Sequence, residues 1–245
     1  MKKILAGLVI CLLSTVLCRG QAVQTVPLQV SLLDPVQLFS DEADVIGLRL
    51  NLLYGCNRNV SGIDVGLCSD VKKSFAGIGL SGLLNSSGEA AGIYLAGICN
   101  LTGGGFGGIE VAGFLNIFSD ASVLESSTWR GLQLSGVANA SVVMRGIQVC
   151  GFGNMADNMK GIELAGVGNF VDTMAGLQVA GLVNLGWNVE GVQLAGLYNR
   201  ANQMRGLQFG LVNKAHQLNG VQIGLLNIIT KDLSFSALPL VNASF

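Results

Sequence analysis

The amino-acid sequence predicts an all-β protein, a single elongated β-solenoid of about twelve 15-residue repeats with capping strands at its ends. The first observation is a phrase of about nine residues that recurs along residues 131–227 at nearly constant spacing. The second is an alternation of apolar and polar residues at the start of each copy, which is typical of a strand. The third is the pair of glycines in each short unit, which disfavours a helix by roughly 1 kcal/mol each relative to alanine.

Twelve copies of the repeat cover almost all of the chain after its first 46 residues. The step is mostly 15 residues, with 14 into the last copy. Because each unit of such an array contacts mainly its neighbours, we expect one domain. Seven clear copies and five weaker ones open with a glycine, namely Gly131, Gly146, Gly161, Gly176, Gly191, Gly206 and Gly220, and Gly47, Gly62, Gly77, Gly92 and Gly108.

Each position of the repeat has its own residue type. With the opening glycine as column one, columns two, four and seven are aliphatic or Phe in essentially every copy, and column fourteen is also apolar. Column three is usually polar, most often Gln, and column nine is Asn in ten of the twelve copies. We expect the four apolar columns to point inward and column three to face solvent. Leu194→Asp should then destabilise the fold strongly by burying a charge, whereas Gln193→Lys should be nearly silent.

The two amide columns allow two interpretations. The Asn column is predicted to be structural, with side-chain amides hydrogen-bonded from coil to coil. The Gln column is a candidate binding face for a glycan or another surface, but it can equally be a structural ladder, which is the interpretation we favour. The Asn column comprises Asn139, Asn154, Asn169, Asn184, Asn199, Asn213 and Asn227, and the candidate binding face comprises Gln133, Gln148, Gln178, Gln193, Gln208 and Gln222.

An up-and-down outer-membrane β-barrel, which could form a pore, is the alternative fold. Each copy would then be one strand of nine or ten residues followed by a short loop. The C-terminal Phe245, with Val241 and Ala243 at alternate positions before it, is typical of the end of such a barrel. Against it, the apolar column fourteen would fall in the loops, and Tyr and Trp are scarce where aromatic girdles are expected. The solenoid is therefore the preferred prediction.

The first 22 residues have the pattern of a signal peptide. Two lysines precede the apolar run 4–16, which is too short for a comfortable membrane span. Cleavage is expected after Gly20 or Ala22. Cys18 leaves lipoprotein processing open, but the bulky Leu17 before it favours ordinary secretion. The short basic start indicates a bacterial protein that is exported to the cell surface, the periplasm or the outer membrane.

The remaining segments outside the repeats are predicted to close the array. Residues 23–46 contain two prolines and are expected to form an N-terminal cap or edge strand, where a missing N–H does no harm. The array covers residues 47–227, with a longer loop at 117–130, and residues 228–245 are expected to form a C-terminal capping strand. Half of the residues are hydrophobic and the formal net charge is −1, which excludes a disordered chain and argues against a nucleic-acid partner.

No constellation of reactive residues is visible, so the sequence predicts no enzyme, no metal and no cofactor. His216 is the only histidine and lies in a polar loop, which excludes a histidine-based triad. The run Gly103–Gly105 lacks the following Lys-Ser or Lys-Thr of a phosphate loop and is expected to be a turn. The carboxylates of column three, and Arg49 in the same column, are interpreted as solvated surface charges; the carboxylates are Asp64, Glu110 and Glu163.

The four cysteines after the leader are expected to be mostly buried free thiols. Cys68 and Cys99 share a column two units apart, roughly 9–10 Å at a strand spacing of about 4.8 Å, too far for a disulfide. Only Cys56 and Cys68 remain a candidate pair.

The phrases GLQVAGLVN, GLQFGLVN and GVQIGLLN resemble the repeat of a family of exported surface-repeat proteins from bacteria with two membranes. The first unit, residues 47–67, and the ending LPLVNASF are also similar to that family, although Ser69 stands where the second unit should have its Asn. The resemblance implies a surface or envelope location and nothing catalytic. We therefore expect a non-catalytic, exported structural or binding scaffold, whose partner is an unknown surface or glycan, or the outer membrane itself.

Overall fold

A computed structural model describes residues 23–119, 128–230 and 236–245, and in these segments all regular structure is β. The predicted signal peptide, most of the predicted loop 117–130 and part of the C-terminal segment lie outside the described residues. The strands are β1 (Thr25–Leu33), β2 (Val36–Gln37), β3 (Asp44–Ala96), β4 (Cys99–Thr102), β5 (Phe106–Ala112), β6 (Leu115–Phe118), β7 (Trp129–Ser135), β8 (Ala138–Cys150), β9 (Gly153–Ala165), β10 (Gly168–Ala180), β11 (Val183–Ala195), β12 (Tyr198–Phe209), β13 (Val212–Ile229) and β14 (Ser236–Ser244).

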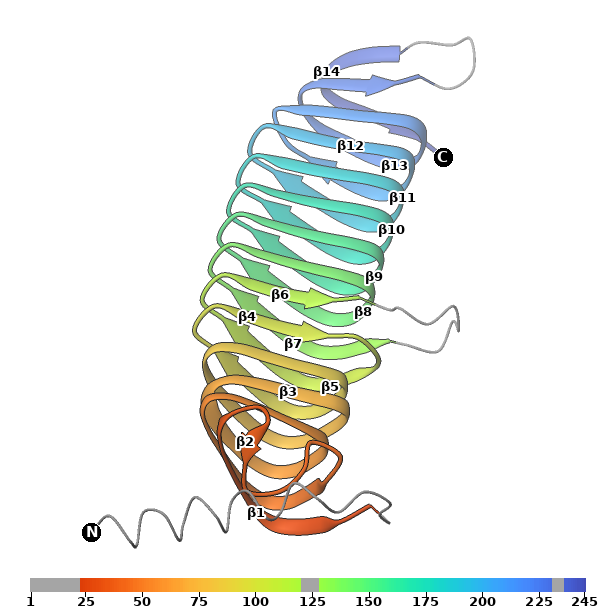
Figure 1. The fold of residues 1–245 in the computed structure, drawn as a ribbon. Helices are drawn as coiled ribbons and strands as arrows, with labels where there is room; N and C mark the ends of the chain where they lie inside the picture. The colour runs from red at the N-terminus through yellow and green to blue at the C-terminus, as the bar shows by residue number, and fades with distance from the viewer. Residues whose placement is uncertain (1–22, 120–127, 231–235) are drawn as a thin grey trace, which may run out of the picture.

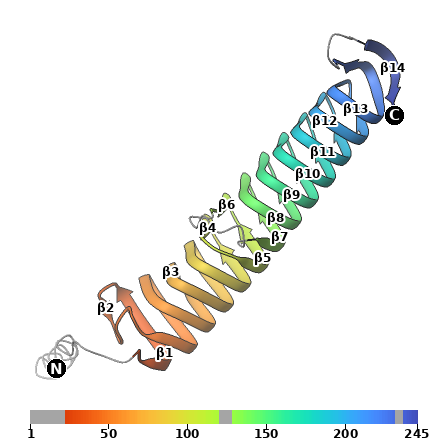
Figure 2. The ribbon, with the colours of Figure 1, turned by 90° about the vertical axis from the view of Figure 1, so that its right-hand side faces the viewer.

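These strands stack as the coils of a β-solenoid, which forms a long rod with β1 at one end and β14 at the other (Figure 1; Figure 2). Successive copies pair in parallel and in register: Gly161 lies beside Gly176, and Gly176 beside Gly191. Antiparallel pairing among the described strands occurs at the two ends, between β1 and β2 and between β13 and β14. The predicted solenoid is thus confirmed. The barrel alternative is wrong, because it requires consecutive copies to run in opposite directions.

The opening glycines explain why the coils can lie so close together. All twelve have a positive φ, between 127° and 146°, a conformation that side chains rarely adopt. A Cβ atom added to Gly176 would also lie 2.0 Å from the carbonyl oxygen of Gly161 in the coil below. Column one therefore requires glycine both for its backbone conformation and for the contact between coils.

The orientation of the strands corrects the sequence prediction. Columns three, five, nine, eleven and fourteen point into the coil, whereas columns two, four and seven point outward. Alternation with period two places columns two and four on the same side of a strand, but it does not say which side is inside. Of the four apolar columns, the inward prediction is correct for column fourteen and wrong for the other three.

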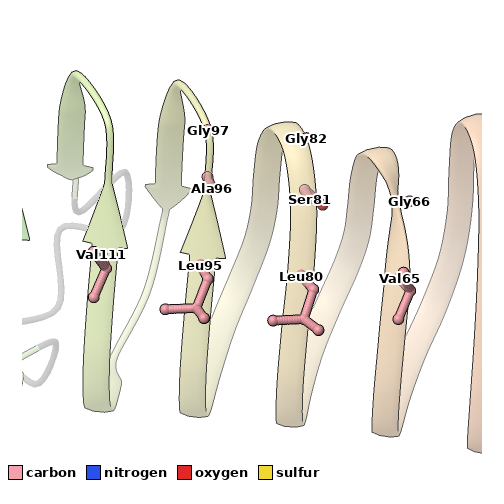
Figure 3. Close-up of a pocket in the computed structure, with 9 residues that line it drawn as sticks. All are labelled: Val65, Gly66, Leu80, Ser81, Gly82, Leu95, Ala96, Gly97 and Val111. Carbon is pink, nitrogen blue, oxygen red and sulfur yellow. The ribbon is translucent and has the colours of Figure 1, made fainter.

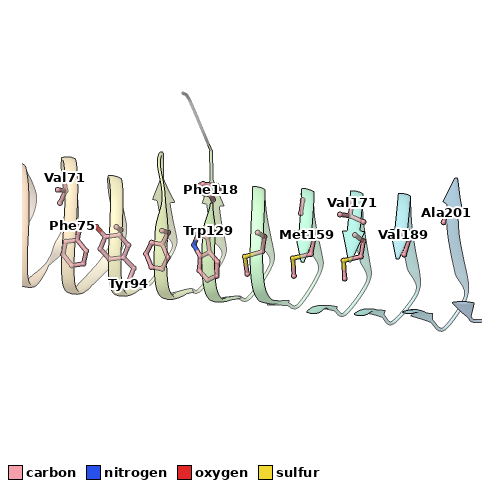
Figure 4. Close-up of a cluster of buried hydrophobic side chains, with 14 of the residues drawn as sticks. Val71, Phe75, Tyr94, Phe118, Trp129, Met159, Val171, Val189 and Ala201 are labelled. Atoms are coloured by element: carbon pink, nitrogen blue, oxygen red, sulfur yellow. The ribbon is translucent and has the colours of Figure 1, made fainter. Parts of the chain in front are cut away.

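Column fourteen and its neighbours form the apolar part of the interior. In the first half of the rod the interior contains aromatic rings. Tyr94 of column three stacks on Phe75 of column fourteen at a centroid distance of 4.4 Å, and Phe106 stacks on Trp129 within column fourteen at 5.2 Å. In the second half the same column continues with methionines such as Met159, as Figure 4 shows. Such stacks of like side chains fill the narrow coil continuously along its axis.

The ends of the rod are covered by strands from outside the repeats. β1 pairs in parallel with the first coil of β3, and β2 folds back on β1. At the other end β14 lies antiparallel on β13, pairing Val221 with Ala243 and Ile223 with Val241. Among the described residues, the structure contains no helix with the length and hydropathy needed to cross a membrane.

Candidate functional site

The Asn column forms the hydrogen-bonded ladder that the sequence predicts. The Nδ2 group of Asn169 donates to Asn184 Oδ1 and to the backbone oxygen of Val179, both at 2.9 Å. The same side-chain bond, 2.8–3.0 Å long, links each Asn to the next from Asn85 to Asn227. All ten side chains are fully buried, so this column stabilises the stack and is closed to ligands.

The Gln column is also a ladder inside the rod, and the candidate binding face at this column is wrong. Gln193 Nε2 donates to Gln178 Oε1 at 2.9 Å, and Gln208 Nε2 donates to Gln193 Oε1 at 2.8 Å. All six residues of the candidate face, Gln133, Gln148, Gln178, Gln193, Gln208 and Gln222, are 0% exposed. A buried amide is stable here because the coil above and the coil below supply its partners.

Glu163 interrupts the Gln ladder. Gln178 Nε2 donates to its Oε2 at 2.7 Å, but a carboxylate has no N–H with which to continue the series toward Gln148 in the preceding coil. Among the described residues, Glu163 Oε1 and Gln148 Oε1 are buried oxygens without a hydrogen-bond partner. Burial raises the pKa of Glu163 to about 7, and the hydrogen bond from Gln178 opposes this rise only in part.

The other charges of column three are buried too, contrary to the prediction of a solvated row. Arg49 Nε donates to Asp64 Oδ1 at 2.8 Å, and their side chains are 0% and 1% exposed. Glu110 accepts hydrogen bonds from Thr102 Oγ1 at 2.7 Å, Gln133 Nε2 at 2.9 Å and Trp129 Nε1 at 3.1 Å. Burial raises the pKa of Glu110 despite these three donors. The charged side chains of this column therefore belong to the interior.

Ser69 occupies the Asn position in the second copy, as the sequence indicates. Its hydroxyl forms short hydrogen bonds with Asp64 and with Arg49. Asn51 Nδ2 also donates to Asp64 Oδ1, at 2.8 Å. The Asn ladder thus begins one coil later, and a buried ion-pair network takes its place at this end of the rod.

The remaining candidate residues do not come together. All four described cysteines are free, so Cys56 and Cys68 are unpaired, and burial raises the pKa of the Cys56 thiol to about 11. His216 Nδ1 lies 3.3 Å from Thr230 Oγ1 on the outside of the coil. Gly103 N donates to Ser87 O at 2.9 Å between coils. No group of three or more His, Cys, Asp or Glu residues in the described part of the chain is arranged to hold a metal ion.

The most distinctive accessible feature is an aliphatic surface, which we define as the outward side chains of columns two, four and seven. Figure 3 shows Val65, Leu80, Leu95 and Val111 of column four projecting from neighbouring coils beside a shallow groove. Column seven lies at the tight bend of each coil and is more exposed, with Phe152 at 59%. Large exposed apolar patches mark binding sites on monomeric proteins.

This surface could have been recognised in the sequence. In all twelve copies columns two and four carry only Leu, Ile, Val or Phe, without one polar exception. Column three, in contrast, is Gln in six copies, whereas a solvated column would vary among Lys, Glu, Ser and Thr. The recurrence of Gln in six of the seven clear copies is therefore the signal of a ladder.

Comparison with protein-family models, with curated proteins and with solved structures gives no match for this chain.

Proposed function

We propose that the chain is a non-catalytic, exported scaffold of the cell envelope that binds its partner through the aliphatic surface. One observation carries the proposal: three apolar columns face outward along the whole array. Exposing so much aliphatic area to water is unfavourable, at about 25 cal/mol for each Å². A surface that stays apolar in every repeat is therefore expected to be covered when the protein works.

The interior supports a structural role for the rest of the repeat. Its polar side chains are engaged in coil-to-coil hydrogen bonds, as in the series from Asn85 to Asn227. Repeat proteins with rigid, uniform stacks use extended outer surfaces for binding. The resemblance to exported surface-repeat proteins and the predicted signal peptide support the envelope location.

The test is a fractionation of cells that make the parent protein or one of two triple variants. The first variant introduces lysine at column four of three adjacent coils, Leu164→Lys, Val179→Lys and Leu194→Lys. We expect the parent to sediment with the envelope and this variant to be released, because three charges would have to be desolvated on binding. Retention of this variant in the envelope would refute the role of the aliphatic surface.

The control variant adds the same charge at exposed positions of column thirteen, Asn158→Lys, Thr173→Lys and Gln203→Lys. It is expected to remain with the envelope. Both variants should keep a β-type circular dichroism spectrum, since all six positions point away from the interior. Recovery of the parent itself in the cytoplasm, with residues 1–22 still attached, would refute the exported scaffold.

A further inference from the structure

The apolar exterior extends beyond the aliphatic surface and wraps around one edge of the rod. Asn154 Nδ2 donates to the backbone oxygen of Leu164, and Gln148 Nε2 donates to Ser141 Oγ at 2.8 Å. These bonds cross the interior between the run of columns two to five and the run of columns eight to eleven. Columns two and four therefore face outward on one side, columns eight and ten on the opposite side, and column seven at the bend between them.

This edge has no charge over seven consecutive coils. From Gly77 to Tyr198, columns two, four, seven, eight and ten contain no Asp, Glu, Lys or Arg, and the exposed Arg200, in column ten of the eighth coil, ends this uncharged part. The second side carries exposed apolar side chains as well, with Met155 and Phe170 both in column ten. We call this uncharged part of the rod the wedge.

Charged residues gather on the opposite, rounded part of the coil, in columns twelve, thirteen and fifteen. We call this part the polar arc. Glu190 and Arg205 of adjacent coils form an exposed ion pair there at 3.3 Å. Its exposed charged residues in the second half of the rod are Arg130, Arg145, Asp157, Lys160, Asp172, Glu190 and Arg205. The rod is therefore amphipathic across its section, with an apolar edge and a charged back.

We propose that the wedge inserts into one leaflet of a lipid bilayer and that the polar arc remains in water, which deepens the proposed function and rests on it. The depth of the wedge matches the thickness of one leaflet. Columns two to seven span five residues, at most about 17 Å at roughly 3.3 Å per residue. One leaflet contributes about 15 Å of the roughly 30 Å hydrocarbon core. The wedge is therefore as deep as one leaflet and half as deep as the bilayer.

A second copy of the chain would not cover this surface. Seven coils at about 4.8 Å, with columns two to ten at roughly 3.3 Å per residue, give on the order of 900 Å². A standard interface buries about 800 Å² on each partner, so the area alone would suffice for a dimer. A rigid partner, however, packs against one side and leaves the bend and the other side in water. Lipid chains are fluid and surround both sides of a wedge.

The hydrogen bonding of the wedge also suits hydrocarbon, where an unpaired backbone group costs several kcal/mol. Consecutive coils pair through their backbone, and at the bend Val167 N donates to Phe152 O at 2.9 Å. The Asn side chains beneath the bend are paired with one another at 2.9–3.0 Å. The wedge thus combines an apolar exterior with a hydrogen-bonded polar interior.

The experiment measures insertion depth by tryptophan fluorescence, with vesicles of zwitterionic lipid whose acyl chains carry bromine as a quencher. The chain has two tryptophans. Trp129 is buried inside the coil and gives the same background in every variant, whereas Trp187 is exposed in column twelve of the polar arc. The test variant combines Phe152→Trp at the bend with Trp187→Phe.

We expect the brominated vesicles to lower the fluorescence of the Phe152→Trp variant and to leave that of the parent, which reports Trp187, unchanged. Leu197→Trp replaces Phe152→Trp at the same column if that variant does not fold. No quenching in either protein, or equal quenching in both, would overturn the leaflet proposal. If quenching is absent while lysines at column four still release the protein from the envelope, the proposed scaffold stands and its partner is a protein.

Discussion

Glu163→Gln is the substitution for which the structure makes the sharpest prediction. It replaces the one carboxylate within the ladder that runs from Gln133 to Gln222 with the amide of its neighbours. The new Nε2 group can donate to Gln148 Oε1, which is buried and without a partner in the described structure. The new Oε1 can still accept the hydrogen bond that Gln178 now donates to Glu163. The substitution should therefore stabilise the protein.

The pKa of Glu163 sets the size of the effect. It is about 7 in the folded protein, against 4.5 for an ordinary Glu. A difference of about 2.5 pH units corresponds to roughly 3 kcal/mol at 1.36 kcal/mol per unit. Between pH 4.5 and 7 the unfolded chain has lost this proton and the folded chain still holds it, so stability falls as pH rises. The cost is absent below pH 4.5 and complete above pH 7.

The assay is thermal unfolding of the parent and of Glu163→Gln at intervals from pH 4 to pH 8.5. Near pH 4 the two midpoints should differ little, since a protonated Glu163 can itself donate to Gln148. Above pH 7 the variant should unfold at a temperature roughly 6–12 °C higher, from about 2–4 °C for each kcal/mol in a chain of this size. Glu110, whose pKa burial also raises, is present in both proteins, so the difference isolates Glu163.

The matched control is Glu190→Gln, at an exposed position of the polar arc. It should change the free energy of unfolding by less than about 1 kcal/mol at every pH, because exposed ion pairs contribute little to stability. A parent-to-variant difference at Glu163 that does not change with pH, or that grows toward acid, would refute the assignment of a proton to this side chain.

Three further predictions follow from the coil geometry and are checked by the midpoint of denaturant unfolding. Gly176→Ala should destabilise the fold by about 1–3 kcal/mol, because Ala rarely adopts the positive φ of this position and its Cβ would collide with the coil below. Gly107→Ala is the control: an added Cβ there meets nothing within 4 Å, so the substitution should be neutral or slightly stabilising. Gln193→Lys should cost about 3–5 kcal/mol by placing an unpaired cation inside the rod, whereas Leu194→Asp should change stability by less than about 1 kcal/mol, the reverse of what the apolar pattern alone predicts. Asn169→Ala should cost about 2–4 kcal/mol, because it removes three hydrogen bonds and leaves buried polar groups unpaired on both sides.

Controls for these variants come from the outside of the same coils. Asn158→Ala, at an exposed position outside the ladder, should be silent where Asn169→Ala is costly. Equal tolerance of Gln193→Lys and Leu194→Asp would contradict the orientation of the strands. A Gly176→Ala variant as stable as the parent would show that the coils can separate locally without cost.

The sequence alone predicted an all-β array of about twelve repeats and favoured the solenoid. The same fifteen-residue period also allowed a barrel, and the parallel pairing of the coils excluded it. Twelve glycines at that spacing predict equivalent backbone positions, and these are the twelve with positive φ. Asn at column nine predicts a ladder, since identical amides in register can each donate to the next. Column fourteen predicts an apolar core, and the rings and methionines from Phe75 to Met204 fill it.

Only the tertiary structure decided which side of each strand faces inward. The usual assumption is that apolar residues face inward and polar residues face outward. For Gln193 and Leu194 this assumption is wrong. The physical reason is that burial of an amide depends on a partner at hydrogen-bond distance in another coil, which no single repeat contains. The stacked coils supply that partner at every step, so the amides occupy the interior, and the aliphatic side chains are left on the surface that we propose to be the binding site.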